Sequence, residues 1–140
     1  MDTNIFVALF SGDEKTSGSA QEALEESYAA GPLVVSPAVY AELVAGRDVG
    51  FVEGFLSEKG IEVDWVLGKE VWEMAGVRYG RYARARRRQR KDSGPRRILA
   101  DFLIGAYALL RADALLTSDT RIYGTYFPEL EVLSPRGVSG

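Results

Sequence analysis

Apolar and polar positions alternate along the chain in a pattern that predicts helices and strands in turn. Short, wholly apolar runs are typical of strands buried on both faces of a parallel sheet, and apolar residues spaced three or four apart predict helices. The predicted helices cover residues 4–10, 16–30, 37–44, 48–58, 69–90 and 96–111. The predicted strands cover residues 33–35, 61–66, 114–117 and, more weakly, 131–133. This order predicts an α/β fold, a three-layer α/β/α sandwich with a mostly parallel central sheet.

The two longest predicted helices carry apolar stripes that we expect to face the core. In residues 69–90 the stripe consists of Val71, Trp72, Ala75, Tyr79 and Tyr82. In residues 96–111 it consists of Leu99, Leu103, Ala106 and Leu110. The first stripe ends near Ala83 while arginines continue, so we expect the far end of that helix to leave the core.

The composition limits the chemistry that this chain can perform. Its 140 residues are enough for a single core, so we expect one domain over residues 1–140. The chain has no cysteine and no histidine. These absences exclude disulfides, thiolate nucleophiles, cysteine-ligated zinc sites, Ser-His-Asp triads and histidine acid–base pairs. An enzyme of this composition must handle protons and metal ions mainly with carboxylates and water.

The sequence favours a protein that works away from membranes. Its longest apolar stretch, residues 98–116, is interrupted by Asp101, Arg111 and Asp113. The stretch therefore predicts a buried helix running into a strand rather than a membrane span. Residues 1–4 contain no basic region of the kind that begins a signal peptide. We therefore expect a cytoplasmic protein.

The net charge of −3 is unevenly distributed. Residues 78–97, here called the arginine strip, contain ten basic residues and one acidic residue, a net charge of +9. The rest of the chain contains seven basic and nineteen acidic residues, a net charge of −12. The strip predicts a helical extension of the domain that binds a polyanionic partner, although a solvated helix surface is the alternative.

Four carboxylates occupy positions where an α/β fold forms its sites. In parallel sheets, sites form outside the carboxyl ends of the strands. Asp119 follows the predicted strand 114–117, Glu42 lies in the helix after residues 33–35, and Asp101 lies among apolar residues early in its helix. Asp2 precedes the first helix, where a first strand would end. A cluster of these four would repel itself unless a cation bound, and all-oxygen ligands suit Mg²⁺ or Mn²⁺.

Three of the four carboxylates also have a simpler interpretation. Asp119 is placed to cap a helix, Glu42 to face solvent, and Asp2 to be a disordered terminal residue. Asp101 is harder to explain without a partner, because its neighbours are apolar. The joint placement of the four residues favours a site over four unrelated roles.

Four segments of the chain together resemble the motifs of PIN-domain nucleases. They are Asp2-Thr3-Asn4-Ile5-Phe6, Ser36-Pro37 leading to Glu42-Leu43, Asp101-Phe102-Leu103-Ile104 with Ala106, and Leu116-Thr117-Ser118-Asp119. The resemblance is greatest to small prokaryotic proteins of the VapC toxin type and extends from residue 2 to about residue 133. Each motif is loose alone, whereas four in order with this spacing are fairly specific.

The resemblance implies an endoribonuclease dependent on Mg²⁺ or Mn²⁺, often homodimeric and often neutralised by a small antitoxin. By position, Asp2, Glu42, Asp101 and Asp119 would be both the catalytic and the metal-binding residues. Asn4 and Thr117 or Ser118 would support them through hydrogen bonds. Asp2 and Asp101 are the expected direct ligands, with Glu42 and Asp119 acting through water.

RNA as the implied substrate gives the arginine strip a specific role. Guanidinium groups bind phosphate through two parallel hydrogen bonds, so the strip is expected to hold the RNA backbone. The arginines predicted to bind it are Arg84, Arg87, Arg88, Arg96 and Arg97. Capture of an acidic antitoxin segment is the alternative role for the same positive charge.

The chain departs from the family pattern at its first motif. Family members usually have several apolar residues before the first acid, forming a central strand, whereas Met1 alone precedes Asp2 here. This departure favours a second interpretation, a catalytically inactive PIN-like module that binds RNA or a protein. The complete acidic quartet favours the nuclease.

Overall fold

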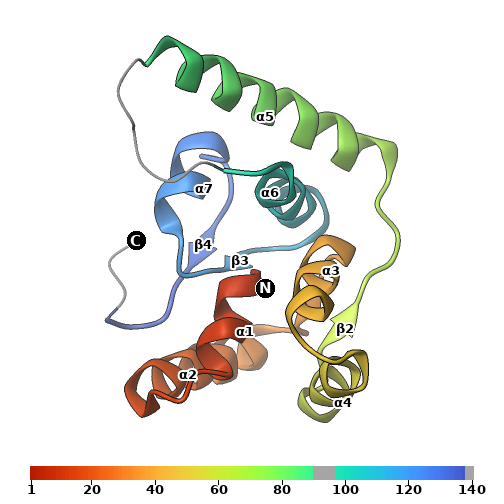
Figure 1. Cartoon of the computed structure of the whole chain (residues 1–140), viewed down its shortest axis with the longest axis vertical. Coiled ribbons are helices and arrows are strands. Elements are labelled where there is room, and N and C mark those ends of the chain that lie inside the picture. The colour runs from red at the N-terminus through yellow and green to blue at the C-terminus, as the bar shows by residue number, and fades with distance from the viewer. Residues whose placement is uncertain (90–96, 138–140) are drawn as a thin grey trace.

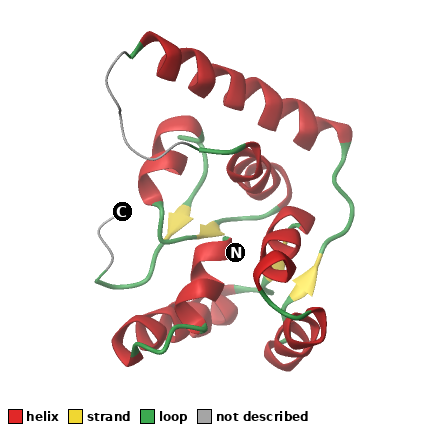
Figure 2. Cartoon of the chain, viewed as in Figure 1, coloured by secondary structure: helices red, strands yellow, loops and turns green. Residues whose placement is uncertain are grey.

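A computed structural model of the chain describes residues 1–89 and 97–137 (Figures 1 and 2). The elements in order are α1 (Thr3–Leu9), α2 (Glu14–Ala30), β1 (Val34–Val35), α3 (Pro37–Gly46), α4 (Val49–Lys59), β2 (Glu62–Val63), α5 (Lys69–Arg88), α6 (Leu99–Arg111), β3 (Leu115–Leu116), α7 (Thr120–Tyr126) and β4 (Val132–Leu133). Every predicted element is present, and the strands are shorter than predicted. The predicted start of the sixth helix, residue 96, lies outside the described residues, and α6 begins at Leu99.

Local sequence signals explain where the helices begin and end. The Ser36 side chain accepts a hydrogen bond from the Val39 amide, and Pro37 occupies the first turn of α3, where no amide partner is needed. The Asp48 carboxylate caps α4 in the same way, by accepting from the Phe51 amide at 3.2 Å. Helix α4 ends at Gly60, whose φ of +67° lies in the left-handed region that favours glycine.

The strands form two parallel pairs rather than one continuous sheet. Val34 and Val35 of β1 pair with Glu62 and Val63 of β2. Strands β3 and β4 pair in the same parallel sense. The prediction of parallel strands is therefore confirmed, whereas the single central sheet is divided into two short pairs.

Strand β3 lies between two layers of helices. Adjacent residues of a strand point to opposite faces, and Leu115 and Leu116 are both buried. Leu115 belongs to the larger core, which also contains Phe102 of α6, whereas Leu116 packs with Ile5 of α1 and Ala23 of α2. Figure 1 shows the β3–β4 pair between α1 and α2 on one side and α6 and α7 on the other. The chain thus has the predicted α/β/α layering.

Met1 and Asp2 join the two strand pairs. The Met1 amine donates to the Val34 carbonyl of β1 at 3.0 Å, and the Asp2 amide donates to the Leu116 carbonyl of β3 at 2.9 Å. Consecutive N–H groups that bond to opposite sides are typical of a strand inside a sheet. These two residues therefore follow the path of a central strand between β1 and β3.

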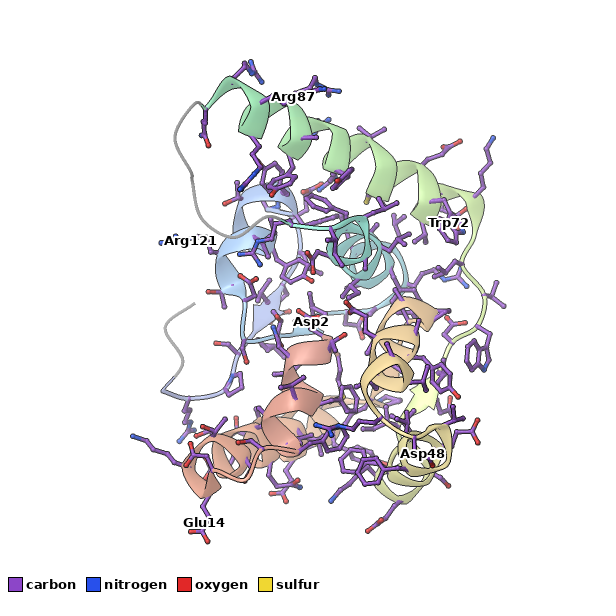
Figure 3. The ribbon with its side chains drawn as sticks, in the orientation of Figure 1. Asp2, Glu14, Asp48, Trp72, Arg87 and Arg121 are labelled. Atoms are coloured by element: carbon purple, nitrogen blue, oxygen red, sulfur yellow. The ribbon has the colours of Figure 1, made fainter. Side chains whose placement is uncertain are left out.

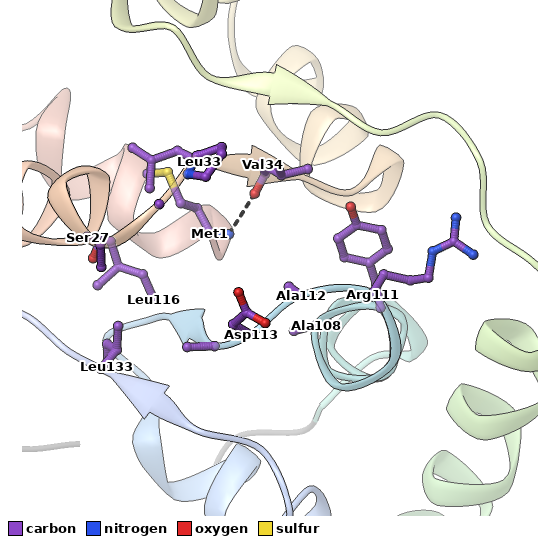
Figure 4. A pocket seen from close by; sticks show the side chains of 15 residues that line it. Met1, Ser27, Leu33, Val34, Ala108, Arg111, Ala112, Asp113, Leu116 and Leu133 are labelled. Carbon is purple, nitrogen blue, oxygen red and sulfur yellow. Dashed lines mark hydrogen bonds between the residues drawn. The ribbon is translucent and has the colours of Figure 1, made fainter.

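A cavity of about 300 Å³ lies beside Met1, between the two strand pairs (Figure 4). Leu33 and Val34 line it on one side, and Leu116 and Leu133 line it on the other. Because the Met1 amine is buried here, its pKa falls to about 6, although attraction to the Asp2 carboxylate opposes the decrease.

The apolar stripe predicted for α5 is correct except for one residue. Val71 and Ala75 are fully buried and Tyr82 is nearly so, but Trp72 is 52% exposed. Beyond Tyr82 the helix continues to Arg88 with its arginines at 84, 87 and 88 exposed, so its last turns leave the core as expected.

The stripe predicted for α6 is correct at Ala106, which is fully buried, and at Leu103, which is partly buried against the core, but it is wrong at both ends. Leu99 and Leu110 are exposed. The buried residues of this helix are Phe102, Ile104, Gly105, Ala106, Tyr107 and Ala108. Helix α6 contacts α5, α3 and β3, so most of its circumference is covered and a single narrow stripe does not describe it. None of the described helices is long and apolar enough to cross a membrane.

The buried amine predicts a pH dependence of stability. Its pKa is near 6 in the folded chain and near 8 when unfolded, so between these values the unfolded state binds more protons. The free energy of unfolding should therefore increase by about 2 kcal/mol from pH 6 to pH 8. The chain has no histidine or cysteine to titrate in this range. Denaturant unfolding followed by circular dichroism at both pH values measures the change.

The matched control is the same chain with an acetylated Met1. Acetylation keeps an N–H donor for the Val34 carbonyl and removes the charge, so the increase between pH 6 and pH 8 should disappear. Equal pH dependence in the two forms would show that the amine does not carry the effect.

Candidate functional site

The Asp2 carboxylate is the centre of a hydrogen-bond network at the start of α1 (Figure 3). Asp2 is 6% exposed. One carboxylate oxygen, Oδ1, accepts from the Thr3 amide at 2.7 Å and so caps the helix. The other oxygen, Oδ2, accepts from the Thr117 hydroxyl at 2.7 Å, the Tyr123 hydroxyl at 3.2 Å and the Asn4 side chain at 3.3 Å. These donors fix the position of the carboxylate.

The residues predicted to support the site connect α1 to the segment after β3. The buried Thr117 hydroxyl accepts from the Asn4 side chain at 3.2 Å and from the Asp119 amide at 3.0 Å while it donates to Asp2. Asn4 also accepts from the Ser118 amide at 3.0 Å. Thus Asn4 and Thr117 contribute side chains to the network, and Ser118 contributes its backbone.

The other predicted carboxylates come from three different helices. Glu42 of α3 accepts a hydrogen bond from the Thr3 hydroxyl at 2.6 Å. Asp101 of α6 accepts from the Ile98 amide at 3.1 Å, which places it at the first turn of its helix. Asp119 precedes α7 and accepts from the Ile122 amide at 3.5 Å, so it also acts as the helix cap that its sequence position predicts.

The structure brings these four carboxylates into one electrostatic cluster, here called the acidic cluster: Asp2, Glu42, Asp101 and Asp119. Burial raises the pKa of Glu42, and repulsion by Asp101 and Asp2 raises it further, while the Thr3 hydrogen bond lowers it. The pKa of Asp101 is likewise raised, first by burial and then by Asp2 and Asp119, against the opposing effect of the Ile98 amide. Each carboxylate is therefore within electrostatic reach of another.

Tyr123 contacts Asp2 and is within electrostatic reach of Asp101 and Asp119. Its side chain is almost fully buried, and its pKa is raised by burial and by the negative charges of Asp2, Asp101 and Asp119. At neutral pH its hydroxyl therefore remains protonated and serves as a hydrogen-bond donor to Asp2. Sequence reasoning missed Tyr123 and Thr3. Tyr123 follows Asp119 by four residues, which is about one helical turn. This spacing could have indicated that the two side chains lie on the same side of α7.

The described arginines among those predicted to bind RNA have two different environments. Arg84, Arg87 and Arg88 are exposed near the end of α5, and Figure 3 shows Arg87 pointing away from the body of the protein. Arg97 forms an ion pair with Asp119 instead. Arg96 lies outside the described residues.

The acidic cluster has the donor chemistry of a divalent-cation site. All of its charged groups are carboxylates, which are hard oxygen donors suited to Mg²⁺ and Mn²⁺. Within residues 1–89 and 97–137, however, no three acidic side chains are close enough together to hold one ion as they stand. A cation bound directly by three of these carboxylates would therefore require them to move closer.

Repulsion in the acidic cluster predicts that Asp101→Asn stabilises the fold. Asparagine keeps an oxygen that can accept from the Ile98 amide and removes one negative charge. In the absence of divalent cations at pH 7, we expect a rise in Tm of about 1–3 °C. The rise should disappear below about pH 3, where the carboxyl is protonated in both folded and unfolded chains.

Asp113→Asn is the matched control, because Asp113 is an exposed aspartate away from these contacts. Calorimetric melting of the parent and both variants separates repulsion in the cluster from a general effect of charge removal. An Asp101→Asn chain that melts no higher than the Asp113→Asn chain would contradict the prediction.

Comparisons with known proteins agree with this fold. The structure is similar to the crystal structure of VapBC2 from Rickettsia felis bound to a DNA fragment from their promoter, with a TM-score of 0.57. The two chains are 22% identical, and the similarity covers 95% of each. No curated protein sequence matches the chain. The sequence model of the PIN domain matches residues 1–128. The resemblance seen in the four motifs is thereby confirmed, and the chain belongs to the PIN-domain family.

Proposed function

We propose that the protein is an endoribonuclease that hydrolyses RNA phosphodiester bonds with the help of Mg²⁺ or Mn²⁺. The observation that carries the proposal is the acidic cluster, which assembles from four separate segments around the buried Asp2. The chain has neither histidine nor cysteine, so carboxylates are the groups that remain for acid–base work near neutral pH.

The roles proposed for the four carboxylates follow from their surroundings. Asp2 and Asp101 would bind the cation directly, and Glu42 and Asp119 would act through water or orient the attacking water. When bound, the cation supplies an activated water and offsets negative charge on the phosphate. The raised pKa of Glu42 makes its carboxylate a stronger proton acceptor than an ordinary glutamate.

The neighbouring polar residues would keep Asp2 in place during the reaction. Thr117, Asn4 and Tyr123 all donate to the same oxygen of Asp2. A side chain held by several donors loses little freedom when it binds a ligand, so the network pre-organises Asp2.

The exposed end of α5 is the proposed RNA-binding surface. Arg84, Arg87 and Arg88 lie together there, around a shallow hollow. Arg96 and Arg97 are proposed to extend this surface toward the acidic cluster. The positive charge attracts the phosphate backbone regardless of sequence.

The partners proposed for this chain follow from its family and its fold. The similar solved structure is a VapBC2 assembly on promoter DNA. By analogy, we propose that this chain is the toxin of a toxin–antitoxin pair in the cytoplasm, bound by a small antitoxin, and that it forms a homodimer.

A second candidate function is a PIN-like module that binds RNA or a protein without cleaving RNA. Two observations favour it, namely the spacing of the carboxylates and the ion pair between Arg97 and Asp119. Binding without metal-dependent cleavage would identify this second function.

Cleavage of small RNAs tests the leading proposal. The parent should cleave a mixture of small RNAs with Mg²⁺ or Mn²⁺ and be inactive with EDTA. Asp101→Asn should reduce cleavage by at least about 100-fold, because it removes a charge from a direct ligand. Millimolar Mn²⁺ should also raise the Tm of the parent, since the cation binds the folded state.

The Asp113→Asn chain serves again as the control and should cleave at the parent rate. Cleavage that is unaffected by EDTA, or equal in the Asp101→Asn chain and the parent, would contradict the proposed active site.

Replacement of Arg84, Arg87 and Arg88 by alanine tests the RNA-binding surface. We expect weaker binding of all RNAs and a smaller dependence of affinity on salt, with the slope of log K against log salt reduced by about 2. Fluorescence anisotropy with labelled RNAs at several salt concentrations measures both effects.

A triple alanine variant at the exposed Arg47, Arg121 and Arg136 removes the same charge from other parts of the surface. It should keep most of the parent's salt dependence. If the two triple variants lose the same affinity and slope, the end of α5 is not the RNA-binding surface, and docking of an acidic antitoxin segment becomes the better account of its arginines.

A further inference from the structure

Arg97 places a positive charge inside the acidic cluster. Its guanidinium Nη1 pairs with Oδ2 of Asp119. The two side chains are only 22% and 24% exposed, so most of this pair is shielded from water. A shielded pair with a charge-assisted hydrogen bond is stronger than a surface ion pair.

The charge of Arg97 also acts on a second member of the cluster. It lowers the pKa of Asp101, opposing the burial and the repulsion from Asp2 and Asp119 that raise it. Arg97 therefore offsets part of the repulsion that a divalent cation would otherwise relieve.

The backbone at Arg97 is anchored independently of the Arg97 side chain. The Arg97 amide donates to the Tyr82 hydroxyl at 2.6 Å, and the next amide, of Ile98, donates to Asp101 at 3.1 Å. Tyr82 itself is buried against the rings of Phe102 and Tyr126. The guanidinium can consequently leave Asp119 by rotation of its long side chain, with no displacement of α6.

We infer that Arg97 is an internal counterion that competes with the divalent cation for Asp119. This inference rests on the proposed function, because it requires the acidic cluster to bind a cation. The guanidinium occupies an oxygen of Asp119, and two positive charges at one carboxylate repel each other. The cation, with the water that would join it to Asp119, therefore takes the place of the guanidinium, and the measured affinity includes the cost of breaking the ion pair.

Calorimetric titration of Mn²⁺ into the parent and the Arg97→Gln chain tests this inference without reference to cleavage. The Arg97→Gln chain should bind Mn²⁺ about three- to tenfold more tightly, because no ion pair has to be broken. Arg121→Gln removes the same charge from an exposed position near the start of α7 and should leave the affinity within about twofold of the parent. Circular dichroism confirms that the variants are folded.

A double-mutant cycle separates competition for Asp119 from a general change in charge. In the Asp119→Asn chain the ion-pair partner of Arg97 is absent, so adding Arg97→Gln should tighten Mn²⁺ binding by clearly less than it does in the parent, leaving only its effect on Asp101. A structural role for Arg97 elsewhere in the fold would give the same effect in both backgrounds.

Three results would overturn the inference. The first is equal or weaker binding of Mn²⁺ by the Arg97→Gln chain than by the parent, which refutes the competition while the proposed metal site stands. The second is an equal gain with Arg121→Gln or in the Asp119→Asn background. The third is no Mn²⁺ binding by any of these chains, which refutes the proposed metal site together with the inference.

Discussion

The structure depends on the burial of Asp2 between the two strand pairs. Its amide binds β3, the amine of the preceding residue binds β1, and its carboxylate binds residues of the segment after β3 and of α7. A buried carboxylate is tolerated when donors satisfy it, and Asp2 has four such hydrogen bonds. The same contacts that join the two halves of the fold therefore also orient the central residue of the candidate site.

In the candidate site, repulsion among the four carboxylates is partly offset by hydrogen bonds and by one positive charge. Four carboxylates lie in one electrostatic field, and burial makes their repulsion stronger than it would be in water. Hydrogen bonds from Thr3 and Ile98 and the charge of Arg97 offset part of it. Holding like charges close together in this way costs the fold some stability.

Local patterns in the sequence predicted much of the fold. Helix starts at Ser36 and Asp48 were predictable because caps depend on neighbouring residues. The full extent of the buried surface of α6 was not predictable, because Phe102 and Tyr107 are buried by helices and strands that are distant in sequence. A period of 3.6 residues identifies a helix but does not reveal how many neighbours will surround it.

The sequence likewise predicted some features of the candidate site and not others. The four carboxylates were found because each follows or flanks a predicted strand or an apolar run. The roles of Tyr123 and Thr3 depend on how α7 and α1 are oriented around Asp2, which the sequence does not specify. The ion pair of Arg97 was missed for a related reason. Charge counting treated the strip as uniform, whereas Arg97 and Arg78 each form an ion pair with a carboxylate of another segment.

The enclosed Met1 amine can also report on the motion of the fold. Its pKa of about 6 leaves it mostly neutral, and hence nucleophilic, at pH 7, whereas free lysine side chains are protonated at that pH. An acylating reagent can reach the Met1 amine when β1 and β3 move apart. The rate at which this single nitrogen is acylated therefore measures how frequently the two strand pairs separate, in the way that amide hydrogen exchange measures local opening.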